Sequence, residues 1–120
     1  MSSETFTRII VVIAALLGAA GVAAAAAATH TGDQALLGPL ALIALTHAPA
    51  LIALAAFQAP YRFMPHATVV IAFGALLFSI DLAVRHFTGA ALFPHAAPIG
   101  GTMLIVGWLM LAVSAAIGRR

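Results

Sequence analysis

The sequence predicts an all-α membrane protein in which four transmembrane helices form a compact bundle. The first observation is composition: 64% of the 120 residues are hydrophobic and only 7% are charged, whereas soluble domains carry about a quarter charged residues. The second is that four apolar runs approach the roughly 20 residues that a helix needs to cross a bilayer. They lie at about 9–28, 36–57, 67–84 and 100–117, within one domain covering residues 1–120.

The first run, from Ile9 to Ala28, contains no polar side chain and follows Arg8. It is long enough to cross the membrane. A cation, a short apolar core and an alanine-rich end are also typical of a cleavable secretory signal, and cleavage would leave three helices. We expect the helix to be retained, because its apolar run has the length of a full span.

The second run is uncharged but has Thr46, His47 and Pro49 near its middle. A helix surrounded by lipid avoids such residues, so we expect this part of the helix to face protein or water. Pro49 has no backbone N–H and disturbs the helix one turn earlier, which leaves the carbonyl of Leu45 as an acceptor for a neighbouring group.

The third run remains apolar until Ser79 and Asp81, and the fourth follows Pro98. Both runs begin after a proline, as helices often do. The stretch 85–99 between them is too apolar for a solvated loop and too short to span. We expect it to lie in the membrane interface.

The arginines predict the orientation. An even number of crossings puts both termini on one side, and cytoplasmic segments near helix ends carry the excess of Arg and Lys. With the termini inside, four arginines are cytoplasmic and only Arg85 is outside; the four are Arg8, Arg62, Arg119 and Arg120. We therefore expect a multi-pass protein of the inner (plasma) membrane with both termini cytoplasmic.

Small residues predict where the helices touch. Lipid gives helices no hydrophobic reason to associate, so helices pack where small side chains let their backbones approach closely. We expect contacts at Gly18, Gly21, Gly74 and Gly107, and at Trp108, which lies too deep in its span for an interfacial anchor. Two stripes of small residues should also face other helices or, as an alternative, dock a helix of another protein. They are Ala15, Ala19, Ala23 and Ala27, and Ala75, Ser79 and Ala83.

His47 is the most informative polar residue, because a ring at mid-depth is unfavourable unless it is neutral and paired. One interpretation is a structural histidine bonded to a helix backbone, to Ser79 or to Thr102. The other is a proton relay or a ligand at the bilayer centre. A haem held by two histidines is not predicted, because no second histidine lies at a matching depth.

Asp81 and Arg85 are spaced four apart with the acid first, which favours an ion pair on one helix. The alternative is that Asp81 accepts protons or cations. A lone carboxylate makes no acid/base pair, and the chain has no cysteine, so we expect no enzyme activity, cofactor or metal. Loop histidines without fixed spacing, such as His30, His86 and His95, are only a weak signal for zinc or copper.

Several short motifs carry a family resemblance. Residues 77–79 (LFS), 97–101 (APIGG) and 107–108 (GW) resemble signatures of the DUF423 family, small membrane proteins of unknown function. The run from Gly18 to His30 resembles its glycine- and alanine-rich first helix, and His47 matches a histidine of its second helix. The chain departs from the pattern after residue 79, where the family often has Gly-Ser. The resemblance implies a four-helix inner-membrane protein with no assigned activity.

The APIGG motif also has a physical interpretation. Pro98 suits the first turn of a helix, and Gly100 and Gly101 let that turn press against a neighbour. The unpaired N–H groups of such a helix start form a weakly positive cup. We expect Asp81 to occupy it; the alternative is an anion or a lipid headgroup.

Together these observations predict a non-enzymatic scaffold or accessory subunit in the lipid bilayer, packed as a homo-oligomer or within a larger membrane protein complex. Nucleic acid is excluded as a partner, because the few cations form no basic stripe. The alternative is a small carrier or proton-linked transport element whose path is lined by His47, Ser79 and Asp81. An enzyme acting on lipid or quinone would need a pocket bordered by His47 or by the histidines outside.

Overall fold

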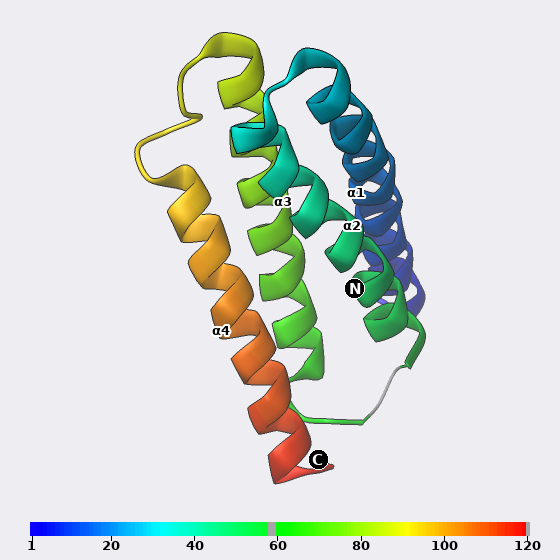
Figure 1. Cartoon of the computed structure of the whole chain (residues 1–120). Helices are drawn as coiled ribbons and strands as arrows, with labels where there is room; N and C mark the ends of the chain where they lie inside the picture. Colours follow the sequence, from blue (N-terminus) through cyan, green and yellow to red (C-terminus); the bar gives the residue numbers. More distant parts are fainter. Residues whose placement is uncertain (58–59, 120) are drawn as a thin grey trace.

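The computed structural model describes residues 1–57 and 60–119 and confirms the all-α class. Within this part of the chain, four helices are long and apolar enough to cross a membrane. They are α1 (Ser3–Thr31), α2 (Gln34–Phe57), α3 (Met64–Thr88) and α4 (Ala96–Ile117). The helices pack side by side in alternating directions as a bundle (Figure 1).

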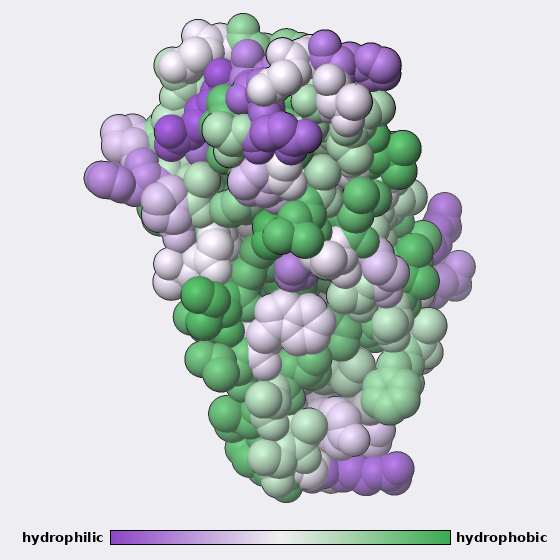
Figure 2. Space-filling view, viewed as in Figure 1, coloured by the Kyte–Doolittle hydropathy of each residue, from purple (hydrophilic) through white to green (hydrophobic). Residues whose placement is uncertain are grey.

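The two ends of the bundle differ in what they contain. The α1–α2 and α3–α4 connections lie at one end, which we call the loop end (Figure 1). The α2–α3 connection and the termini lie at the other, the terminal end, where Tyr61 forms an isolated antiparallel bridge with Arg119. On the face shown in Figure 2, hydrophilic residues gather mainly at these two ends and apolar residues between them.

The helices extend beyond the predicted apolar runs. α1 starts at Ser3, where Ser2 caps it by accepting a hydrogen bond from the backbone of Thr5, and it ends at Gly32 in the left-handed conformation. α3 runs on to Gly89, which has φ 76° and donates its N–H to the carbonyl of Arg85. The length of an apolar run reflects the thickness of the hydrocarbon core, whereas a helix continues through polar residues until a cap ends it.

The connection between the third and fourth helices is therefore shorter than the expected stretch 85–99. α3 includes its first four residues and α4 begins at Ala96 rather than at Gly100. Only residues 89–95 connect the two helices. Pro98 accordingly lies in the first turn of α4, as its missing N–H favours.

α2 and α3 form the centre of the bundle. α1 packs along α2, α4 packs along α3, and α1 approaches α3 only locally. Among the described residues, the backbones of α1 and α4 nowhere come close to each other. The two helices of each hairpin therefore pack closely together, whereas α1 and α3 are in close contact over only a short stretch.

Glycines set the closest helix crossings. A Cβ atom added to Gly100 would lie 2.7 Å from the backbone nitrogen of Phe78, and one added to Gly74 would lie 2.9 Å from the carbonyl oxygen of Gly100. At Gly107 the same atom would meet Ile71 at 2.6 Å. Real Cβ atoms never come so close, so α3 and α4 can adopt this spacing only because the residues are glycines.

The glycines of α1 behave differently from each other. A Cβ on Gly21 would lie 2.7 Å from the side chain of Leu45, whereas one on Gly18 would meet Ala48 at an ordinary 3.6 Å. Gly101 likewise has room, with 3.9 Å to Phe78. Gly18 and Gly101 therefore do not limit how closely the helices approach.

The alanine stripe predicted as the contact face of α1 is wrong. Ala15, Ala19 and Ala23 are exposed, and Ala27 is half-buried. The buried face of α1 is instead formed by Ile10, Ala14, Leu17, Gly21, Ala24 and Ala28. Alanine occurs on every side of this helix, so spacing alone does not single out one face. On α3, by contrast, Ala75 and Ser79 of the predicted stripe are buried and Ala83 is half-buried.

Candidate functional site

His47 lies at the middle of α2 with both ring nitrogens engaged. Its Nδ1 is 2.8 Å from the carbonyl oxygen of Ile43, and its Nε2 accepts a hydrogen bond of 3.1 Å from the indole N–H of Trp108. Because Nε2 is the acceptor, Nδ1 carries the proton and donates it to the carbonyl. This assigns a neutral imidazole, held between α2 and α4.

The partners of His47 differ in part from those expected. A helix backbone is indeed one partner, but it is the carbonyl of Ile43 and not the one that Pro49 frees at Leu45. The second partner is Trp108, which is 61 residues away in the chain, and not Ser79 or Thr102. Trp108 therefore joins α4 to α2 through a polar contact as well as through packing; its ring centroid lies 5.9 Å from that of His47.

Asp81 and Arg85 form the expected ion pair, and the Asp81 side chain is fully buried within the bundle. The Nε of Arg85 donates to Oδ2 at 2.8 Å, with the Asp81 side chain 0% and the Arg85 side chain 35% exposed. The other carboxylate oxygen accepts a 2.7 Å hydrogen bond from the backbone N–H of Leu92. Asp81 therefore ties the α3–α4 connection to α3.

Asp81 is bonded near the start of α4, as expected, but to a backbone group that precedes the helix. The backbone N–H that donates to the Asp81 carboxylate is that of Leu92, which lies before α4 rather than in its first turn. The APIGG motif meets α3 directly, since Gly100 lies against the backbone of Phe78. Both features fasten the start of α4 to α3.

A second acidic contact at the loop end was not predicted. The Nδ1 of His86 lies 2.7 Å from a carboxylate oxygen of Asp33, which joins α3 to the α1–α2 connection. No spacing in the sequence indicates a contact between residues 53 apart. In the described part of the chain, no three His, Cys, Asp or Glu side chains gather as a metal site would require.

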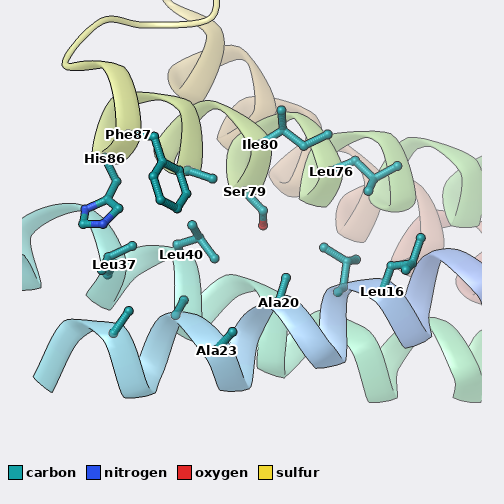
Figure 3. A pocket seen from close by; sticks show the side chains of 14 residues that line it. Leu16, Ala20, Ala23, Leu37, Leu40, Leu76, Ser79, Ile80, His86 and Phe87 are labelled. Atoms are coloured by element: carbon teal, nitrogen blue, oxygen red, sulfur yellow. The ribbon is translucent and has the colours of Figure 1, made fainter. Parts of the chain in front are cut away.

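A groove of about 460 Å³ opens between α1 and α3 and reaches the loop-end part of α2. Its walls are almost entirely apolar (Figure 3). The lining residues come from α1 (Leu16, Leu17, Ala20, Ala23, Ala24, Ala27), α2 (Leu37, Leu40) and α3 (Leu76, Ser79, Ile80, Ala83, His86, Phe87). The groove follows from the loose approach of α1 to α3, which hydrophobic periodicity does not show.

Ser79 is the unusual residue of this groove. It is 5% exposed, and its Oγ has no hydrogen-bond partner among the described residues. Figure 3 shows the hydroxyl directed from α3 into the space facing α1. A buried hydroxyl without a partner is unfavourable by about 1–3 kcal/mol, so such groups call for an explanation. Of the predicted candidates, Ser79 is the one whose chemistry the fold leaves unused.

Comparison with known proteins agrees with the motifs. The model of the family described as "Protein of unknown function (DUF423)" matches residues 17–101, a segment that includes His47, Ser79, Asp81 and the APIGG motif. No curated protein and no solved structure matched the chain. Since the family model covers most of the sequence, the chain belongs to the DUF423 family of proteins of unknown function.

Proposed function

We propose that the protein is a non-enzymatic accessory or scaffold subunit that packs against a larger membrane protein assembly. The observation that supports this is the outward face of α1. Ala15, Ala19 and Ala26 lie on one side of the helix, and all three are exposed. Small residues bring helices together in membranes but gain nothing from contact with lipid. A face of this kind, unused within the described molecule, fits a helix of another protein.

The state of the polar side chains supports a structural role as well. His47 is neutral and bonded at both nitrogens, and Asp81 is paired with Arg85 and accepts a hydrogen bond from a backbone N–H. Groups bonded in this way hold helices together. A catalytic group, by contrast, needs a bonding position that is free for substrate. We infer no catalytic step from them.

We further propose an inner-membrane location with both termini cytoplasmic. The terminal end carries Arg8 and Arg119, while the loop end carries Arg85, which is paired with Asp81. The larger number of arginines at the terminal end supports this orientation.

The test is native mass spectrometry of the protein extracted gently from its own membranes at its natural expression level. We expect a complex of defined mass, which Ala19→Leu reduces by placing a bulky side chain on the docking face. Ala20→Leu, a change of the same size on the neighbouring groove side, is the matched control and should leave the complex intact. A monomer or a homo-oligomer as the only species, or equal effects of the two variants, would contradict the proposal.

Transport remains the alternative, with His47 and Asp81 lining a proton-linked path. The bonded states of both residues support it less than they support a structural role. In proteoliposomes, His47→Ala would alter flux at unchanged assembly if transport were the function. If His47→Ala only lowered stability, the transport hypothesis would lose its only residue at mid-depth.

A further inference from the structure

We propose that the groove between α1 and α3 binds an isoprenoid quinone, with the hydroxyl of Ser79 donating a hydrogen bond to a ring carbonyl. Such a molecule combines a planar ring bearing two carbonyl acceptors with a long hydrocarbon tail. The binding site does not depend on the accessory role proposed above. It follows from the length, volume and polarity of the groove.

The length of the groove matches one leaflet of a bilayer. Its lining runs from Leu16 to Ala27 on α1 and from Leu76 to Phe87 on α3. At a rise of 1.5 Å per residue, each wall is about 16 Å long. The hydrocarbon core of a membrane is about 30 Å thick, so the groove leads from the loop end to about the bilayer centre. Its occupant is therefore a molecule that resides within the membrane.

The volume of the groove suits a slender molecule. A space of about 460 Å³ that extends over about 16 Å holds a hydrocarbon chain or a flat ring lying along the groove. A helix of a second copy or of a partner resting on the groove would change the oligomeric state, and the variants below test for this.

The depth of Ser79 separates a quinone from a phospholipid. Ser79 precedes His86, at the loop end of the groove, by seven residues, or about 10 Å along the helix. The ester and phosphate oxygens of a phospholipid stay near the interface, so its acyl chain would leave this hydroxyl facing only CH₂ groups. A quinone ring can enter the hydrocarbon region and bring an acceptor to Ser79.

The rim of the groove carries a second polar group on the same side of α3. His86 and Ser79 are seven residues apart, which places them on one helix face. Asp33 binds the Nδ1 of His86, so Nε2 is the ring nitrogen that remains for a ligand. Apolar pockets with a few placed polar groups are typical of small-molecule sites. Ser79 and His86 are the polar side chains that line this groove in the described residues.

The experiment uses the purified full-length protein in quinone-free phospholipid nanodiscs. The probe is a short-tailed azido-ubiquinone, which is photo-crosslinked and mapped by peptide mass spectrometry, with decylubiquinone as the competitor. We expect the label on α1 or α3 beside the groove. Ser79→Ala should weaken competition by decylubiquinone about tenfold, the effect of losing one hydrogen bond, without lowering thermal stability.

A second pair of variants keeps the test independent of Ser79. Ala20→Leu fills the groove from an exposed position and should abolish labelling, whereas Ala19→Leu, directed away from the groove, should not change it. Labelling elsewhere, or labelling insensitive to both Ser79→Ala and Ala20→Leu, overturns the proposal. So does a groove occupied only by phospholipid, or a change in oligomeric state caused by Ala20→Leu. No partner is present in this assay, so its failure is distinct from failure of the accessory role.

Discussion

Substituting Gly100 by alanine tests whether the α3–α4 crossing depends on glycine. The new Cβ would lie 2.7 Å from the backbone nitrogen of Phe78, 3.0 Å from the carbonyl oxygen of Gly74 and 3.1 Å from the Cα of Phe78. All three atoms belong to the backbone, so none can rotate away as a side chain would. The methyl group is accommodated only if the two helices move apart. Gly101 is the matched control, because its added Cβ has 3.9 Å to the ring of Phe78.

The two substitutions should change stability in opposite directions. Alanine is favoured over glycine in a helix by about 1 kcal/mol, and both variants gain this term. Overpacking opposes it at Gly100 by about 1–3 kcal/mol, and backbone contacts place the value at the upper end. We expect Gly100→Ala to lower the free energy of unfolding by about 2 kcal/mol and Gly101→Ala to raise it by about 1 kcal/mol. The predicted gap between the variants is about 3 kcal/mol.

SDS titration in mixed micelles, followed by circular dichroism, measures this free energy of unfolding for each variant. Helix content in the absence of SDS should be the same as in the parent protein, so that the difference reports packing. If Gly100→Ala proved as stable as Gly101→Ala or more so, the close approach of α3 and α4 would not be what glycine provides here.

Four other substitutions test the polar contacts by the same titration. Trp108→Phe removes the donor to His47 and should lower the free energy of unfolding by about 1 kcal/mol; no change would mean that the indole bond is not formed. Arg85→Met should cost about 2 kcal/mol, less than the 3–5 kcal/mol of a fully buried pair, because the arginine is 35% exposed. Adding Asp81→Asn should restore part of this loss, and a further loss would argue against the ion pair. Ser114→Ala leaves the backbone N–H at the start of α3 without its 2.8 Å acceptor and should cost about 1–2 kcal/mol; an unchanged value would exclude that bond.

Whether a contact of a candidate residue could be predicted depends on how far apart the two partners lie in the sequence. The Asp81–Arg85 pair was predictable because a helix brings residues four apart together. The partner of His47 was not, since Trp108 is 61 residues away on a helix whose register is set by packing. Ser79 was recognised as a polar residue in an apolar run, but the groove it faces depends on the distance between α1 and α3. The Asp33–His86 contact likewise requires two connections to meet at the loop end.

The sequence by itself determined the class, the number of helices and their approximate positions, because whether a segment can cross a bilayer depends on the length and apolar composition of that segment. Tertiary structure alone decided which face of α1 is buried, since small residues surround that helix on all sides and lipid distinguishes none of them. It also decided that α1 and α3 stay apart. The packing of α1 on α2 and of α4 on α3 leaves a space between α1 and α3 open, and Ser79 faces into it.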